Sequence, residues 1–168
     1  VSTYLHDHVK EGAILSVGMP SGEFFLKEED KPVVLIAGGV GITPLMSMYK
    51  NLSRRTNRKV SMIQCALNSE SRAFAKEIEE GKREGVTAQL LYDQPLATDV
   101  LGTDYDHKGY LDLATLGAIS DLKESAVYFC GPKAFMANTL SLLNTLGVAD
   151  EAIHYEFFGP AEELEVAK

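Results

Sequence analysis

Residues 33–44 read Val-Val-Leu-Ile-Ala-Gly-Gly-Val-Gly-Ile-Thr-Pro, and this stretch decides the expected fold. Its first five residues form a continuous apolar run, which is typical of a strand that is covered on both faces. The glycines that follow permit a tight turn, and Thr43 as N-cap with Pro44 behind it is a typical start of a helix. The stretch therefore predicts a buried strand, a glycine turn and a helix in direct succession.

Short apolar runs and longer amphipathic stretches continue to alternate as far as residue 157. Further strands are predicted at residues 60–66, 87–92, 126–130 and 153–157, and helices at residues 45–52, 73–80, 111–116 and 132–146. Strands that alternate with helices predict an α/β fold, because parallel neighbours need a crossover connection. The expected architecture is a five-stranded parallel sheet flanked by helices, with a long loop at residues 93–110.

Residues 1–30 depart from this pattern. A short helix is predicted at residues 2–9 and short strands at residues 14–19 and 23–26, with no crossover helix between the strands. Successive strands without a helix are typical of an antiparallel unit. We therefore expect residues 1–30 to be the remnant of an antiparallel β-barrel and residues 31–168 to be the parallel-sheet domain. Since the chain begins with Val1 and not with Met, we expect a piece of a longer protein.

Composition argues against several classes of function. The 168 residues include 16 basic and 24 acidic side chains, which give a formal net charge of −8. Nucleic acids and anionic membranes favour clustered Lys and Arg, so neither is expected as a partner. No signal peptide and no membrane-spanning run is visible, which favours a cytoplasmic protein. Cys65, Cys130 and the four histidines show no metal-ligand spacing, so no metal site is predicted.

The glycine turn is the first candidate for a binding site. Gly38, Gly39 and Gly41 carry no Cβ, so the backbone can approach a pyrophosphate, and the helix that follows offers free N–H groups. The alternative is a turn with a structural role only. The turn also differs from the usual dinucleotide fingerprint, because Pro44 replaces the third glycine and residues 66–68 carry no acid. A different nucleotide-binding family is therefore indicated.

Three segments in a fixed order point to that family. They are residues 39–44, the Cys-Gly-Pro run at residues 130–132, and the Tyr-Glu-Phe-Phe-Gly-Pro run at residues 155–160. Together they resemble the pyridine-nucleotide half of ferredoxin–NADP reductase-type flavoproteins. Residues 1–6, 22–25, 92–95 and 153–156 narrow the resemblance to the reductase portion of bacterial flavohemoglobins, which are nitric oxide dioxygenases. It extends over nearly the whole chain.

The resemblance implies a role for individual residues. The NAD(P)H phosphates are expected at Gly39, Val40, Gly41, Ile42, Thr43 and Pro44, and the nicotinamide beside Cys130, Gly131 and Pro132. FAD is expected at Phe157, Phe158, Gly159 and Pro160, with Phe158 over the flavin ring, and its pyrophosphate near Ser2. Glu156 is the candidate catalytic residue, expected to tune the redox behaviour of flavin and haem. The choice between NADH and NADPH stays open, although Arg72 is close enough in sequence to reach a 2′-phosphate.

The resemblance also implies an overall reaction. A hydride passes from NAD(P)H to FAD, and electrons then pass to haem, where O2 converts nitric oxide to nitrate. The Arg-x-Tyr-Ser flavin motif of the family and a globin are both missing from these 168 residues, so haem is expected only in the full-length protein, with globin and FAD domains as partners in the same chain. Two alternatives stay open: a reductase that feeds an iron–sulfur oxygenase or free flavin, and a nucleotide-binding module without catalysis of its own.

Overall fold

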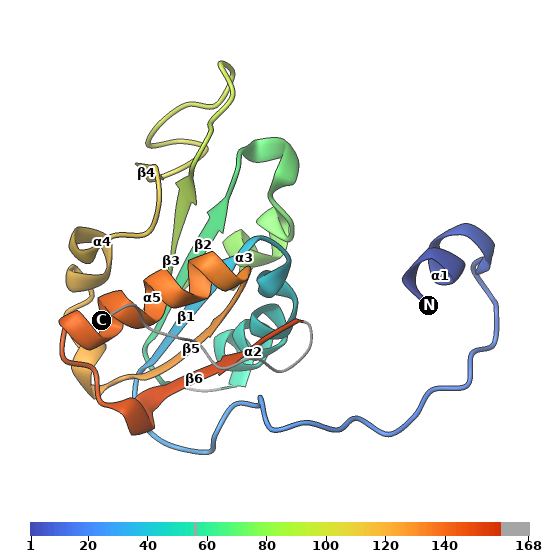
Figure 1. Ribbon diagram of the computed structural model, residues 1–168, viewed down its shortest axis with the longest axis horizontal. Helices are drawn as coiled ribbons and strands as arrows, with labels where there is room; N and C mark the ends of the chain where they lie inside the picture. The colour runs from blue at the N-terminus through green and yellow to red at the C-terminus, as the bar shows by residue number, and fades with distance from the viewer. Residues whose placement is uncertain (56, 159–168) are drawn as a thin grey trace.

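The computed structural model describes residues 1–55 and 57–158, and its centre is a parallel sheet with the strand order β4-β3-β2-β1-β5-β6 (Figure 1). Every pair of neighbouring strands is parallel, which confirms the predicted α/β class. The strands are β1 (Val33–Gly38), β2 (Val60–Ala66), β3 (Val86–Tyr92), β4 (His107–Lys108), β5 (Ala126–Cys130) and β6 (Ile153–Glu156).

The sheet has six strands where five were predicted. The additional strand, β4, lies inside the predicted long loop and pairs its two residues with Leu91 and Tyr92 of β3. Two residues are too few to produce a hydrophobic period, so the sequence pattern could not reveal this strand.

Helices cover both faces of the sheet. The helices are α1 (Ser2–His8), α2 (Ile42–Arg55), α3 (Ala75–Gly81), α4 (Leu113–Gly117) and α5 (Lys133–Thr145), with 3-10 turns η1 (Gly39–Gly41), η2 (Ser69–Ser71), η3 (Leu122–Glu124) and η4 (Asp150–Ala152). Leu35 and Met62 pack with α2 and α3, whereas Ile36 and Phe129 pack with α4 and α5. Because successive residues of a strand point to opposite faces, each central strand is buried on both sides, as its apolar run predicts.

Helix α2 begins at Ile42, three residues before the predicted helix at residues 45–52. The turn η1 leads directly into the helix, and the N–H of Ile42 donates to the carbonyls of Gly39 and Val40. The hydroxyl of Thr43 donates to the Val40 carbonyl at 3.1 Å, so Thr43 is not the N-cap. Pro44 lies in the first turn, where its missing N–H costs no helix hydrogen bond.

The N-terminal segment that carries α1 runs away from the sheet (Figure 1). Helix α1 confirms the predicted short helix, but residues 14–19 and 23–26 are not strands. A strand needs a neighbour that satisfies its N–H and C=O groups, and no described segment lies beside residues 14–19 in that way. Further along, the N–H of Lys27 donates to the hydroxyl of Tyr128 at 3.0 Å, so the chain joins the sheet there. The expected division into domains near residue 30 stays a prediction.

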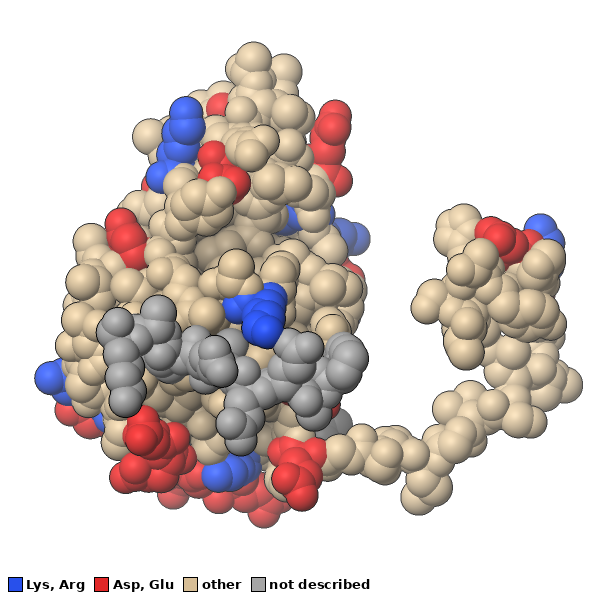
Figure 2. Space-filling view, viewed as in Figure 1, with Lys and Arg blue, Asp and Glu red and all other residues tan. Residues whose placement is uncertain are grey.

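The surface agrees with the acidic composition. In Figure 2, acidic side chains gather on the lower part of the molecule, over η4 and the segment that leads into β1. Among the described residues, the helices are all too short or too polar to cross a membrane.

Tyr49 offers a test of the packing between α2 and α3. Its side chain is fully buried and its hydroxyl donates to the carbonyl of Ile78 at 2.8 Å. We expect Tyr49→Phe to lower the free energy of unfolding by about 1 kcal/mol at pH 7, because the carbonyl loses its partner. Urea unfolding measures this change, and Tyr4→Phe, at an exposed phenol, is the matched control.

The same variant tests a pH dependence. Burial, together with the charge of Glu79, raises the pKa of Tyr49 from 10.0 to about 12. The unfolded chain therefore loses this proton near pH 10 while the folded chain keeps it. The stabilisation is complete below pH 10 and is lost as the pH rises toward 12. The difference between parent and Tyr49→Phe should narrow over that range, and a constant difference would contradict the raised pKa.

Candidate functional site

The carboxyl ends of β1 and β5 form the point where the direction of winding reverses. From β1 the chain proceeds outward through β2, β3 and β4, and then crosses back to β5 and β6 on the other side of β1. Open α/β sheets bind ligands outside the carboxyl ends of the strands at such a point. The strand register places Ala37, Cys130 and Glu156 side by side. The three segments that the sequence singled out therefore follow three adjacent strands.

The loops after β1 and β5 touch through their backbones. A Cβ on Gly41 would overlap the carbonyl of Cys130, and it would lie 2.6 Å from the N atom of Gly131. A Cβ on Gly38 would lie 2.7 Å from the ring of Phe135. The missing side chain of Gly41 therefore makes room for the neighbouring loop. We had expected it to make room for a phosphate. The structural interpretation of the turn thus applies to Gly41, and a binding role for Gly39 stays a prediction.

Gly39 is the glycine that faces outward. It is exposed, its φ is +51°, and nothing lies within 4 Å of the position of a Cβ. This left-handed conformation costs a residue with a side chain roughly 1 kcal/mol, which explains glycine here. Val40 beside it is also exposed. Gly39 and Val40, together with the exposed Thr43, are therefore the part of the predicted phosphate loop that is open to solvent.

A cleft of about 680 Å³ opens beside Gly39. It lies between the ends of β1, β2 and β3, the segment after β4 and the first turns of α5. The lining residues are Gly38, Gly39, Cys65, Ala66, Leu67, Asp93, Gly109, Tyr110, Leu111, Pro132, Ala134, Phe135 and Asn138. Of the predicted nucleotide-binding residues, Gly39 and Pro132 line the cleft, whereas Cys130 and Gly131 are buried behind it.

The cleft has the features that a dinucleotide needs. Its volume lies in the range of small-molecule sites, and its walls are largely apolar, as suits a base. Helix α5 begins at Lys133 without a side-chain cap, so N–H groups of its first turn are open beside Pro132 and Ala134. An anion is stabilised by such N–H groups and by the helix dipole. The residues present therefore fit a nicotinamide nucleotide.

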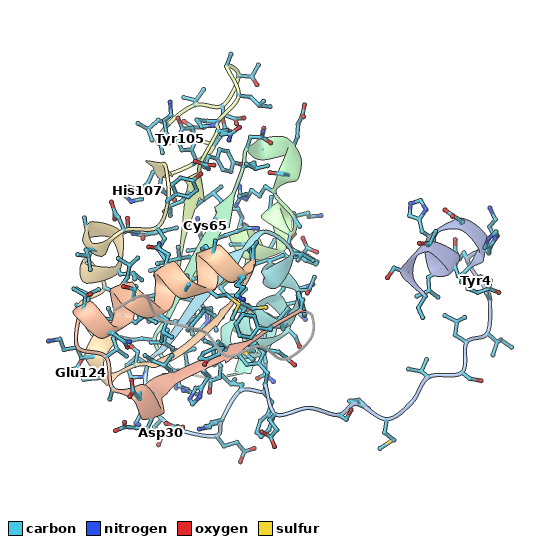
Figure 3. All side chains as sticks on the ribbon, in the orientation of Figure 1. Tyr4, Asp30, Cys65, Tyr105, His107 and Glu124 are labelled. Carbon is cyan, nitrogen blue, oxygen red and sulfur yellow. The ribbon has the colours of Figure 1, made fainter. Side chains whose placement is uncertain are left out.

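The segment at the end of β6 is exposed. Glu156 is exposed as the last residue of the strand, Phe157 packs partly against the α5 side, and Phe158 is 54% exposed. The ring of Tyr155 lies 5.2 Å from that of Phe129 and 5.9 Å from that of Phe157. Gly159 and Pro160 lie outside the described residues. Ser2, in α1, is not brought near the other candidates; the label of Tyr4 in Figure 3 marks this distant helix.

Sequence reasoning missed several residues of the cleft: Leu67, Asp93, Tyr110, Phe135 and Asn138. Leu67 and Asp93 directly follow β2 and β3, so the rule that ligands collect at strand ends could have found them. Tyr110, Phe135 and Asn138 enter through the packing of α5 and of the segment after β4. No local pattern marks them.

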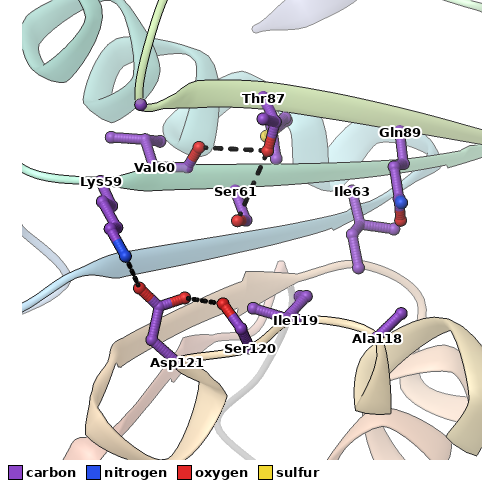
Figure 4. A pocket seen from close by; sticks show the side chains of 12 residues that line it. Lys59, Val60, Ser61, Ile63, Thr87, Gln89, Ala118, Ile119, Ser120 and Asp121 are labelled. Carbon is purple, nitrogen blue, oxygen red and sulfur yellow. Dashed lines mark hydrogen bonds and ion pairs between the residues drawn. The ribbon is translucent and has the colours of Figure 1, made fainter.

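A second pocket, of about 260 Å³, lies at the opposite edge of the sheet (Figure 4). It is lined by the first residues of β2 and β3 and by residues 118–121, and Lys59 pairs there with Asp121 at 3.2 Å. It is remote from the carboxyl ends of the strands, so it is not the candidate site.

Residues 35–140 match the family model described as the oxidoreductase NAD-binding domain. This match covers β1 to the middle of α5, and thus the whole lining of the cleft. The chain belongs to the oxidoreductase NAD-binding domain family. The matched region contains the whole cleft at the switch point, which makes this cleft the candidate nucleotide site.

Relatives of this NAD-binding domain are flavohemoproteins. The flavohemoprotein of Bacillus cereus is 44% identical over 98% of this chain, and that of Rhodopirellula baltica is 41% identical over the same share. The chain spans 42% and 41% of those two proteins. These matches confirm the resemblance that the sequence motifs indicated.

Solved structures of flavohemoglobin-type reductases also resemble this chain. The flavohem-like FAD/NAD binding domain of nitric oxide dioxygenase from Vibrio cholerae is 35% identical, with a TM-score of 0.78 over 95% of this chain and 65% of that chain. The flavohemoglobin of Malassezia yamatoensis, with bound FAD and heme, is 25% identical, with a TM-score of 0.68 over 82% of this chain and 35% of that one. A ferredoxin reductase of carbazole 1,9a-dioxygenase, at 18% identity, TM-score 0.67, and 81% and 40% coverage, shares the fold alone.

The contact between the two loops predicts different effects for two glycines. We expect Gly41→Ala to lower the free energy of unfolding by about 1–3 kcal/mol, because its Cβ overlaps the Cys130 carbonyl and forces the loops apart. Gly39→Ala should cost only about 1 kcal/mol, since it meets open space and pays for backbone conformation alone. Urea unfolding of both variants measures the difference. Equal losses would contradict the loop contact.

The two cysteines predict a chemical test. Burial, and then the charge of Glu156, raises the pKa of the Cys130 thiol to about 11, and burial raises that of Cys65 to about 12. Because the thiolate is the reactive form, we expect neither cysteine to react with iodoacetamide at pH 8 until the chain is unfolded. Mass spectrometry counts the modified thiols, and alkylation in 6–8 M urea serves as the control, where both thiols should react. Alkylation of the folded chain would contradict the prediction.

Proposed function

We propose that this domain is the NAD(P)H-binding reductase portion of a flavohemoprotein. The whole protein would take a hydride from NAD(P)H onto FAD and pass electrons to haem, where O2 converts nitric oxide to nitrate. The flavohemoproteins that match 98% of the chain support this function. The structural observation that carries it is the joined pair of loops after β1 and β5, which lies between the nucleotide cleft and the exposed end of β6.

NAD(P)H would be held by the cleft and by the loop beside it. Gly39 and Val40 offer exposed backbone for the phosphates, and Pro132 with Ala134 brings the open first turn of α5 to the same place. Gly41 and Ile42 are buried and would act indirectly, by positioning Gly39, whereas Thr43 is exposed and Pro44 half-buried, so both remain proposed contacts. Cys130 and Gly131 support Pro132 from beneath. When bound, the nicotinamide supplies the hydride and the flavin accepts it.

FAD would lie at the end of β6. Phe158 offers an exposed aromatic face, which suits stacking on a flat ring system. Glu156 places a carboxylate two residues before it, where it would oppose negative charge on a nearby reduced flavin. Phe157, Gly159, Pro160 and Ser2 are further proposed contacts. The globin and FAD domains would belong to the same full-length chain, and haem would be bound there. A cytoplasmic location suits the two free thiols, Cys65 and Cys130.

The full-length protein with Glu156→Gln tests this proposal. Removal of the carboxylate should raise the midpoint potential of the flavin by roughly 30 mV, because reduction no longer adds charge beside an acid. Anaerobic titration with reference dyes measures the potential, and stopped-flow spectroscopy measures reduction by NADH and the onward step to haem. Glu151→Gln, at the other end of β6, is the matched control and should leave the potential unchanged. If Glu156→Gln leaves the potential and both rates at the parent values, Glu156 has no role toward the flavin.

A further inference from the structure

The nucleotide cleft contains a single charge. Among its thirteen lining residues, all within the described part of the chain, Asp93 is charged, and neither Lys nor Arg occurs. Leu67 and Tyr110 are large exposed apolar side chains in the same lining. A ligand that fits this lining presents a flat apolar group and hydrogen-bond donors to a carboxylate, and carries no anionic group at that position.

Backbone hydrogen bonds hold Asp93 in its place. Its N–H donates to the carbonyl of Ala66 at 3.1 Å, and the N–H of Gln94 donates to that of Leu67 at 2.9 Å. The N–H of Gly109 donates to the carbonyl of Tyr92 at 2.8 Å. The segments after β2, β3 and β4 are therefore joined to one another. Asp93 lies in a preformed wall and not on an independent loop.

Tyr110 lies beside Asp93 in the lining of the cleft. The neighbouring carboxylate, as hydrogen-bond acceptor and through its charge, raises the pKa of the Tyr110 phenol. Tyr110 itself is 75% exposed. The pair thus places an aromatic ring and an ionised acid side by side in the lining of the cleft.

Arg72 cannot neutralise a phosphate in this cleft. Its guanidinium is bonded to the side chain of Gln64 at 3.4 Å and lies 3.5 Å from the carboxylate of Glu79, and its side chain is only 15% exposed. These partners belong to a different pocket, of about 200 Å³, on the α3 side. Arg72 is therefore held away from the cleft lining, and the expectation that it could reach a 2′-phosphate has no support in this arrangement. Lys108 and Lys133 also lie near the carboxyl edge, but neither lines the cleft.

We propose that Asp93 makes this cleft accept the adenosine part of NADH and reject that of NADPH. The inference rests on the proposed function, since it concerns the same nucleotide site. A ribose diol can donate hydrogen bonds to the carboxylate. Acidic side chains accept such bonds from the ribose in other dinucleotide sites. A 2′-phosphate adds a charge of about −1.5 to −2 beside an acid that no cation in the lining offsets. The Asp93 carboxylate thus selects NADH by repelling the 2′-phosphate of NADPH. Tyr110 and Leu67 would contact the adenine base of either nucleotide.

5′-AMP and 2′,5′-ADP are the probes, because they differ only in the 2′-phosphate. With the 168-residue chain at pH 7.5, we expect calorimetric titration to show 5′-AMP binding at least about tenfold more tightly than 2′,5′-ADP. Asp93→Asn should reduce this ratio to about twofold or less by strengthening the binding of 2′,5′-ADP. The asparagine in this variant has the shape of aspartate and keeps a side-chain oxygen that can accept a hydrogen bond, so the main change is the loss of the negative charge. Thermal unfolding checks that the variant is folded.

Three further variants separate the explanations. Glu124→Gln removes one negative charge in η3, at the amino end of β5 and far from the cleft in Figure 3, and should leave the ratio unchanged. Tyr110→Ala should weaken both probes by a similar factor, since the ring contacts the shared base. Glu70→Gln, just after β2 and outside the lining, should change the ratio less than Asp93→Asn does.

The outcomes distinguish this inference from the proposed function. If the parent chain binds neither probe, the nucleotide site itself is wrong and both proposals fall. If the parent binds both probes equally, or if Asp93→Asn leaves the ratio unchanged, only the role of Asp93 is overturned. If Glu70→Gln changes the ratio of the two affinities as much as Asp93→Asn does, the role of Asp93 in selecting the nucleotide is also overturned.

Discussion

The backbone contact between Gly41 and the Cys130–Gly131 peptide is the constraint on which the site depends. Any side chain at position 41 would occupy the volume of the Cys130 carbonyl, so the loops after β1 and β5 can meet only through glycine. Their meeting closes the gap at the switch point of the sheet. The outer surface of this junction presents Gly39 and Pro132, and the cleft begins there. A packing requirement inside the domain thus determines where a ligand can approach its surface.

Burial on both faces of the sheet makes this junction rigid. Val33 to Ala37 of β1 and the whole of β5 are buried, and helices cover them from both sides. Parallel strands of this kind expose only their ends, so chemistry is confined to the edge where the loops emerge. The two cysteines illustrate the consequence. Both lie at strand ends beside the cleft, yet burial keeps their thiols protonated and leaves them as packing groups.

The carboxyl edge of the sheet has two regions of different charge. The first turn of α5 and the glycine turn present N–H groups to an anion, whereas the wall formed after β3 presents the carboxylate of Asp93. A dinucleotide combines anionic phosphates with an uncharged diol, so its two parts suit the two regions. The end of β6, with Glu156 and Phe158, lies on the other side of the joined loops. Under the proposed function, the base, the phosphates and the flavin would follow one another in this order along the edge.

The sequence by itself determined the fold class, because apolar runs, glycine turns and amphipathic stretches follow one another with the periods of strands and helices. Each of the five strands predicted for the sheet is present, whereas the two short strands predicted within residues 1–30 are not, and the motifs at residues 39–44 and 130–132 lie at the carboxyl edge of the sheet. Tertiary structure alone decided which glycine faces outward, where Arg72 points, and that Asp93, Tyr110 and the first turns of α5 share one cleft. The reason is that a periodic pattern reports burial along one element, whereas a site forms where several elements meet, and their meeting depends on contacts between residues far apart in the chain.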